Sequence, residues 1–169
     1  MFGPPGVAYL YLVYGMHDCL NVVTEPDGRP AALLIRAVEP EEGIAVMRDA
    51  RIERELARRP SLGAAGRERL VRRLATEPDS RLASGPGRVT AAFGLDRSQT
   101  GVDLLDPRSA LRIESPPFSE LIESMVTGPR VGVGYAGEPW ASLAWRFAIA
   151  DSPAVSSPRP PGPGASGSG

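Results

Sequence analysis

The chain has 169 residues, 42% of them hydrophobic, and a formal net charge of −1. This length suits one domain with a sizeable core, and no apolar run reaches the roughly 18 residues that a membrane span needs. The single cysteine, Cys19, excludes an intrachain disulfide and a cysteine-based metal site, and it favours a reducing cytoplasm. The first residues do not read as a secretory signal.

Every basic residue is an arginine, and between residues 47 and 96 arginines outnumber acidic residues. The exclusive use of arginine indicates a GC-rich genome more than a function. The basic middle of the chain could form a DNA-facing patch. It could equally be a solvated helix face, and the sequence leaves both interpretations open.

Three apolar segments near the beginning of the chain predict a sheet. Residues 7–14 are rich in β-branched and aromatic side chains, and residues 19–24 form a second strand-like run. Together they predict a hairpin whose tip lies in residues 14–18. After a turn at residues 25–28, residues 31–38 read as a third, buried strand. An antiparallel meander is expected.

The middle of the chain predicts helices. Residues 39–42 open a helix that continues to Pro60, with acidic residues suited to the positive end of its dipole. Residues 61–75 are a second helical stretch. A loop at residues 84–87 precedes a short helix around residues 89–93.

The last third of the chain is less regular. Residues 101–114 read as short extended pieces, and residues 129–134 and 145–149 read as strands. We expect one domain over residues 1–153 and a disordered tail rich in Pro, Gly and Ser over residues 154–169. The fold class is α+β, with a small, mostly antiparallel sheet and packed helices.

A series of short motifs resembles one known family, the alkyladenine (3-methyladenine) DNA glycosylases. The motifs follow the family's order along most of the chain, and each would be weak alone. They occupy residues 9–21, 33–40, 47–48, 84–90, 93–95, 101–104, 130–133 and 145–147. The resemblance implies an alkyladenine-glycosylase-like fold that acts on double-stranded DNA.

The resemblance also implies a mechanism, because a glycosylase must flip its target nucleotide out of the duplex to reach the bond that it cuts. Tyr14, at the predicted hairpin tip, resembles the family's residue that intercalates from the minor groove. Met16 and His17 would contact DNA beside the lesion. We interpret His17, the only histidine, as a groove contact and not as a catalytic base.

Two residues resemble the family's base pocket. Tyr11 would form an aromatic wall that attracts a cationic methylated purine by about 0.5–2 kcal/mol, whereas Tyr9 is interpreted as a core residue. Strand alternation would place Tyr11 and Tyr14 on opposite faces. Asn21 resembles the residue that crowds the exocyclic amino group of unmodified guanine. A buried strand amide is the alternative for Asn21.

Two arginines are predicted to contact DNA phosphates. Arg36 resembles a family arginine at the pocket edge that supports the flipped nucleotide, although an arginine in an apolar strand is more often a paired structural ion. Arg88 follows a Gly-Pro-Gly loop, and such loops bring backbone N–H groups close to anions.

The catalytic residue is not found by this resemblance. The family's general-base glutamate and the pocket's second aromatic wall belong to a segment that would precede Met1, so the chain resembles the family with its N-terminal part missing. Asp18, expected at the DNA-facing tip, and Glu39, explained by helix capping, are weak substitutes. The catalytic residue is therefore left unknown.

The sequence predicts a base-excision-repair enzyme that hydrolyses the N-glycosidic bond of alkylated purines such as 3-methyladenine. No metal or other cofactor is expected, and the protein should be a monomer in the cytoplasm, associated with the nucleoid in a bacterium. The alternatives are a catalytically inactive module that binds lesions, and a fragment too incomplete to fold stably.

Overall fold

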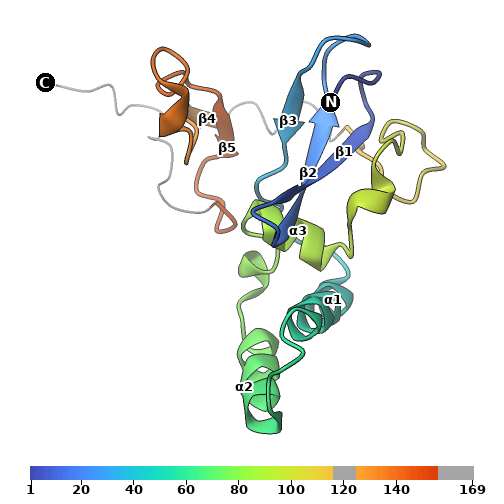
Figure 1. Ribbon diagram of the computed structural model, residues 1–169, viewed down its shortest axis with the longest axis vertical. Helices are drawn as coiled ribbons and strands as arrows, with labels where there is room; N and C mark the ends of the chain where they lie inside the picture. Colours follow the sequence, from blue (N-terminus) through green and yellow to red (C-terminus); the bar gives the residue numbers. More distant parts are fainter. Residues whose placement is uncertain (116–124, 156–169) are drawn as a thin grey trace, which may run out of the picture. The chain divides into compact units, whose positions relative to one another are not determined.

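The computed structural model of the chain describes residues 1–115 and 125–155. The chain folds as two compact units, Met1–Glu114 and Ser115–Gly169, which are described separately below. Both units contain antiparallel strands, and the first also contains the α-helices (Figure 1). The predicted α+β class is confirmed.

The sheet of the first unit has three antiparallel strands in the order β1-β2-β3 (Figure 1). Strands β1 (Ala8–Val13) and β2 (His17–Val23) form the hairpin, and β3 (Ala32–Leu34) pairs with the end of β2. The predicted meander is therefore confirmed.

The third strand is shorter and less buried than predicted. Only three residues of the expected run at 31–38 are in β3, and Leu33 is 49% exposed. Beyond β3 the chain leaves the ladder, and Ala37 forms an isolated bridge with Ser84. The first part of the apolar run therefore belongs to the sheet, and its last part pairs with the segment that precedes the short helix.

One face of the hairpin forms the main core. Because side chains alternate along a strand, Ala8 and Leu10 of β1 and Leu20 of β2 share this face. They pack with Leu95 and Leu104 from later in the chain, and all five are at most 7% exposed. This burial anchors the hairpin on one side and leaves its other face for different contacts.

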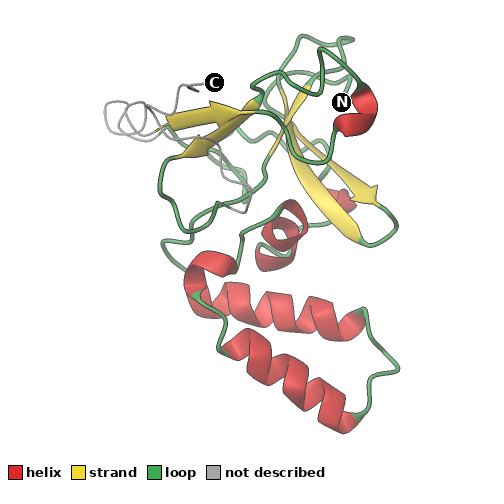
Figure 2. Cartoon of the chain, turned by 90° about the vertical axis from the view of Figure 1, so that its left-hand side faces the viewer, coloured by secondary structure: helices red, strands yellow, loops and turns green. Residues whose placement is uncertain are grey.

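Three α-helices and two 3₁₀ helices complete the first unit. Figure 2 shows α1 (Ile44–Ala57) and α2 (Ala64–Ala75) side by side, with α3 (Pro86–Ala92) between α1 and the sheet. The 3₁₀ helices are η1 (Asp79–Arg81) and η2 (Arg97–Gln99). All three predicted helices are present, with different bounds.

The first helix begins later than predicted. Residues 39–42 are not helical, and α1 starts at Ile44 after Gly43, whose φ of 71° is left-handed. No acidic residue lies in the first turn of α1. The expected pairing of these acids with the helix dipole is therefore wrong.

Residues 101–114 contain no strand, but part of this segment runs alongside the beginning of β1 and forms backbone hydrogen bonds there. The Ala8 N–H donates to the Val102 carbonyl at 2.8 Å, and the Leu104 N–H donates to the Gly6 carbonyl at 2.9 Å. These bonds satisfy backbone groups at the outer edge of β1.

The second unit contains a two-stranded antiparallel sheet of β4 (Met125–Gly128) and β5 (Arg146–Ile149). The predicted last strand is confirmed as β5. The predicted strand at residues 129–134 is wrong, because Gly132 has a left-handed φ of 78° and the 3₁₀ helix η3 (Gly134–Ala136) follows. Most of the predicted tail lies outside the described residues.

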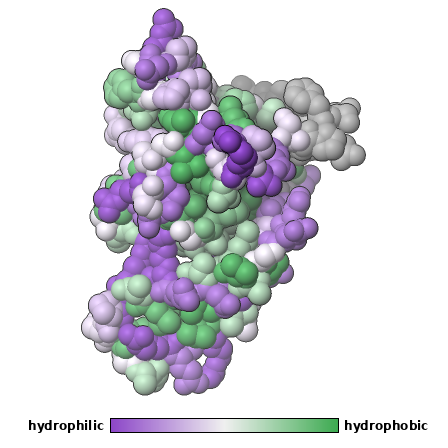
Figure 3. Space-filling view, turned by 90° about the vertical axis from the view of Figure 1, so that its right-hand side faces the viewer, coloured by the Kyte–Doolittle hydropathy of each residue, from purple (hydrophilic) through white to green (hydrophobic). Residues whose placement is uncertain are grey.

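The surface mixes polar and apolar side chains. On the face that Figure 3 displays, hydrophobic residues lie among hydrophilic ones. In the part of the chain that the structure describes, no helix is long and apolar enough to cross a membrane.

Candidate functional site

The tip of the β1–β2 hairpin is a tight turn. The Met16 N–H donates to the Val13 carbonyl at 3.0 Å, and the two residues between them, Tyr14 and Gly15, have φ values of 51° and 69°. Positive φ at both central positions is what a type I′ hairpin turn requires. Tyr14 is 88% exposed and Met16 is 58% exposed, so the turn presents two large side chains to solvent.

Tyrosine is an unusual residue for this backbone. Asparagine and glycine are typical of the first central position of such a turn, whereas a bulky side chain at positive φ costs on the order of 1 kcal/mol or more. Strain of this kind is found most often at functional positions. The conformation of Tyr14 therefore makes the hairpin tip a candidate for contact with a ligand.

The hairpin face opposite the core carries the predicted pocket residues. In the register of the two strands, Tyr9 lies across from Asn21, and Tyr11 lies across from Cys19. The two tyrosine rings stack with their centroids 5.6 Å apart, and Tyr11 is 38% exposed. The structure thus brings Tyr11 and Asn21 to one face. Strand alternation does not extend to Tyr14, because β1 ends at Val13.

Asn21 is buried and uses its amide group to join the two strands. Its Nδ2 donates to the Tyr9 carbonyl at 3.1 Å and to the Cys19 carbonyl at 3.2 Å. These bonds fit both interpretations of Asn21, and its role in the base pocket stays a prediction. Its oxygen, Oδ1, is the atom that can accept a hydrogen bond from a base.

His17, just below the tip, contacts two helices. Arg58, the C-cap residue of α1, donates to His17 Nδ1 at 2.8 Å, which requires the neutral tautomer with its proton on Nε2. Burial lowers the pKa of His17, and Arg58 lowers it further, against the opposite effect of Glu55. Helix α3 approaches so closely that a Cβ at Gly87 would lie 2.9 Å from the imidazole ring. These contacts with Arg58 and α3 hold the imidazole ring of His17 in place.

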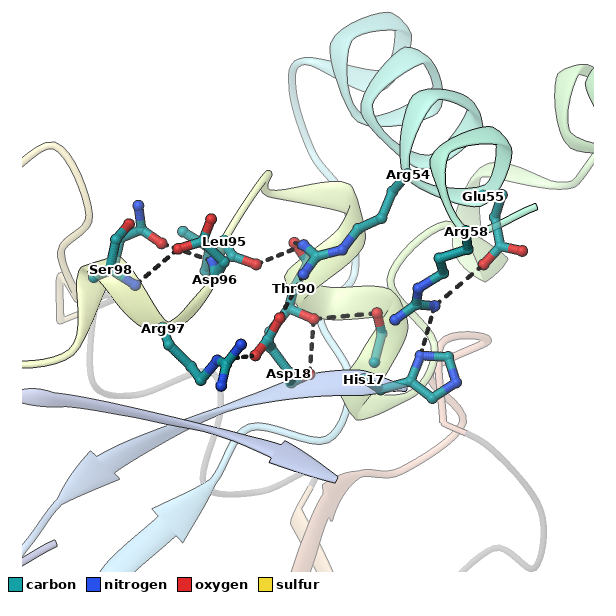
Figure 4. A network of polar contacts seen from close by, with 12 residues as sticks. His17, Asp18, Arg54, Glu55, Arg58, Thr90, Leu95, Asp96, Arg97 and Ser98 are labelled. Atoms are coloured by element: carbon teal, nitrogen blue, oxygen red, sulfur yellow. Dashed lines mark hydrogen bonds and ion pairs between the residues drawn. The ribbon is translucent and has the colours of Figure 1, made fainter. Parts of the chain in front are cut away.

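Asp18 is buried and is not exposed at the hairpin tip, so the predicted position of its side chain is wrong. Its side chain is buried, and its Oδ2 accepts a hydrogen bond from Arg54 Nη2 at 2.7 Å (Figure 4). Arg97 Nε lies 3.5 Å from Oδ1, and the Thr90 hydroxyl donates to the Asp18 carbonyl at 2.8 Å. Asp18 therefore fastens β2 to the elements around it.

Arg36 lies just beyond β3 and is half-buried. Within residues 1–115 and 125–155, we find no hydrogen bond or salt bridge that would make it the paired structural ion considered as an alternative. Its charge acts on Cys19. Burial raises the pKa of the Cys19 thiol and Asp18 raises it further, while Arg36 partly opposes this rise. Its role at the pocket edge stays a prediction.

Arg88 takes part in an ion-pair network. Its Nη1 donates to Glu77 Oε1 at 3.0 Å and to the Arg81 carbonyl at 3.0 Å, and Glu77 also binds the buried Arg51 of α1. A phosphate contact by Arg88 stays a prediction, and it would compete with Glu77 for the guanidinium.

A cleft of about 580 Å³ lies between the hairpin tip and the helices. Tyr14 and His17 line it on the hairpin side, and Glu55, Glu77 and Arg88 line it on the helical side. The cleft therefore joins the exposed tip to the ion-pair network below it.

The arginines of α1 have a role that the sequence did not reveal. Three of them, together with Arg58 at the C-cap, are turned toward other elements of the unit and bind their side chains or carbonyls: Arg48, Arg51, Arg54 and Arg58. Arg48, for example, donates to the carbonyls of Leu74 at 2.6 Å and Glu77 at 2.8 Å. Because their guanidinium groups are bound within the unit, these four do not form a solvated helix face, and a DNA-facing patch in the basic middle of the chain stays a prediction. Only their 3–4-residue spacing could have indicated one shared helix face.

In the described part of the chain, no group of three or more His, Cys, Asp and Glu side chains is placed to hold a metal ion. The side chains that the structure gathers at the hairpin and its cleft carry aromatic rings, an amide, an imidazole, carboxylates and guanidinium groups.

Comparison with known proteins identifies the class of protein to which this chain belongs. The family model of methylpurine-DNA glycosylases matches residues 1–153. A protein of Methanocella arvoryzae named "Putative 3-methyladenine DNA glycosylase" is 41% identical over 160 residues, covering 95% of this chain and 66% of that protein. Proteins with the same name from Myxococcus xanthus and Anaeromyxobacter dehalogenans are 40% and 41% identical and cover 96% and 95% of this chain.

The chain belongs to the methylpurine-DNA glycosylase family. It spans 66%, 64% and 58% of the length of these three relatives. The predicted family is confirmed, whereas the role of each site residue stays a prediction.

Proposed function

We propose that this chain carries the DNA-engaging surface of a glycosylase that removes alkylated purines, such as 3-methyladenine, from double-stranded DNA. The observation that carries the proposal is Tyr14, 88% exposed at positive φ on the hairpin tip. Family membership and the names of the relatives agree with this function. The protein would act as a monomer on DNA in the cytoplasm.

The tip has the properties that base flipping needs. Flipping a nucleotide costs a few kcal/mol of stacking and pairing, and a side chain inserted from the minor groove can fill the vacated space. The exposed ring of Tyr14 would be that wedge. Met16 and His17 would contact the flanking nucleotides.

The hairpin face that carries Tyr11 and Asn21, opposite the core face, would receive the flipped base. A methylated purine is often cationic, and the half-exposed ring of Tyr11 attracts a cation over its face. Asn21 is fixed by two hydrogen bonds, so its Oδ1 would meet the base edge without reorganisation. Arg36 and Arg88 would contact phosphates, where a guanidinium binds through paired hydrogen bonds.

Hydrolysis of the N-glycosidic bond adds water at C1′ and releases the purine at N9. A general base must lie within hydrogen-bond reach of that water. Asp18 does not meet this condition, because it is paired with Arg54 and its side chain alternates to the strand face opposite Tyr11 and Asn21. We assign no catalytic residue. The second candidate function is lesion binding without cleavage, in which the same surface engages DNA and Asp18, held by Arg54, supplies no general base.

The test uses two equally exposed tyrosines. Tyr14 and Tyr135 are 88% and 89% exposed, so Tyr14→Ala and Tyr135→Ala remove matched side chains from different places. Binding to methylated and unmethylated duplexes is measured for both variants and for the original chain, together with release of free 3-methyladenine.

We expect the original chain to prefer methylated DNA and Tyr14→Ala to weaken binding by about 1–3 kcal/mol, the usual value of one stacked aromatic. Tyr135→Ala should bind normally. Release of 3-methyladenine would support the enzyme, and preferential binding without release would support the second candidate. Equal binding to both duplexes would refute both functions.

A further inference from the structure

Two consecutive residues of β2 lie directly below the hairpin tip and are both held by α1. His17 is bound by Arg58 and Asp18 by Arg54, and the two arginines are one helical turn apart (Figure 4). Although neighbouring side chains of a strand point to opposite faces, both His17 and Asp18 are reached by arginines from the same end of α1.

The Asp18 side of this attachment is buried and has several bonds. Arg54 donates to Asp18 Oδ2 at 2.7 Å and, through its other nitrogen, to the Leu95 carbonyl at 2.5 Å. Thr90, 1% exposed, donates its hydroxyl to the Asp18 carbonyl at 2.8 Å. One strand residue is thus tied to α1 and α3 together.

The His17 side is closer to the tip and more accessible. Val13 and His17 are the last pair of the hairpin ladder, and Arg58 donates to His17 Nδ1 at 2.8 Å. Arg58 also lies 3.5 Å from Glu55 on its own helix, which helps to orient the guanidinium. The turn that carries Tyr14 begins directly above this pair.

We infer that His17 and Asp18 are positioning residues: their attachment to Arg58 and Arg54 holds the hairpin tip, and with it Tyr14, in the orientation that enters DNA. The inference rests on the proposed function for its purpose. The attachment itself is a property of the free protein.

The tip needs such support because little else holds it. Among the described residues, the one hydrogen bond of the turn itself joins Met16 to Val13, and both Tyr14 and Met16 are exposed. A mobile tip would lose its conformational freedom on insertion and would bind more weakly. A wedge displaced by about 1 Å also loses its alignment with the base step. The attachment of His17 and Asp18 to Arg58 and Arg54 therefore determines the orientation in which Tyr14 inserts.

The first test measures the order of the tip in the protein without DNA. The ¹⁵N order parameter of the Gly15 amide is compared in the original chain, Arg58→Met and Arg59→Met. Arg59 is the matched control because it neighbours Arg58 and shares Glu55 as its partner, but does not bind His17.

We expect an order parameter near 0.85 in the original chain and Arg59→Met, and below about 0.6 in Arg58→Met. Arg54→Met should act in the same direction, and Arg58→Met decides the question if loss of the half-buried Arg54 prevents folding. An unchanged Gly15 order parameter in Arg58→Met would overturn the inference.

The second test asks whether Arg58 acts through Tyr14. Arg58→Met should weaken binding to methylated DNA about tenfold in the original chain and at most about twofold in a Tyr14→Ala background. An equal loss in both backgrounds would mean that Arg58 contacts DNA itself, and would overturn the inference. Failure of the original chain to bind methylated DNA would refute the proposed function, while the Gly15 measurement would still decide the attachment.

Discussion

The two faces of the β1–β2 hairpin differ in chemistry and, along β1, in burial. On one face, Ala8, Leu10 and Leu20 are at most 7% exposed and pack in the core. On the other, the tyrosine rings stack, Tyr11 is 38% exposed, and Asn21 joins the strands through its amide. Alternation along the same strands thus separates side chains that maintain the fold from those that we propose to meet the purine. Substitutions on the two faces should therefore have separable effects.

The largest effect is expected on the core face. Leu10 is 3% exposed, so Leu10→Ala should lower the free energy of unfolding by about 2–5 kcal/mol through lost burial and a residual cavity. Urea denaturation followed by circular dichroism measures this change. A loss below about 1 kcal/mol would mean that this face does not carry the main core.

A smaller and different effect is expected on the opposite face. Tyr11→Ala should weaken binding to methylated duplex by about 1–3 kcal/mol, the value of one stacking platform, and reduce stability less than Leu10→Ala. Tyr11→Phe is the control, because it keeps the aromatic face and should keep the affinity. If Tyr11→Ala changes stability and not affinity, the division between the two faces is wrong.

The smallest effect is a pH dependence at His17. Burial and Arg58 lower its pKa below 6.5, Arg54 acts in the same direction, and Glu55 and Asp18 oppose them. The unfolded chain therefore takes up a proton at higher pH than the folded protein. The contribution of His17 to stability is complete above about pH 7 and declines as the pH falls through 6.5.

Thermal melting between about pH 7.5 and 5.5, a window above the carboxylate range, should show a falling Tm in the original chain. His17→Gln cannot take up this proton, so its Tm should fall less. Parallel profiles for both chains would contradict a lowered pKa of His17.

Local patterns predicted the local structure. The two apolar runs before and after Tyr14-Gly15 predicted the hairpin, and the motif there identified the tip residue that the structure exposes. The third strand was overestimated, because Val38 packs against the Ala83 cluster and Ile35 packs against both this cluster and the main core, beyond the end of β3. An apolar run alone does not show which core its residues will join.

The position of Asp18 could not be read from its neighbours. In sequence it belongs to the hairpin tip, but its partner Arg54 is 36 residues away and reaches it from α1. The same holds for the arginines of α1, whose targets are carbonyls and carboxylates on separate elements. Charge along the sequence shows where basic residues occur, whereas their partners depend on tertiary packing.

The left-handed conformation of Tyr14 sets stability against activity. Asparagine or glycine would adopt this turn with less strain, so selection for a stable fold alone would replace the tyrosine. A design procedure that optimises folding energy would therefore remove the side chain on which the proposed activity depends. Such stability–activity conflicts are common at functional positions.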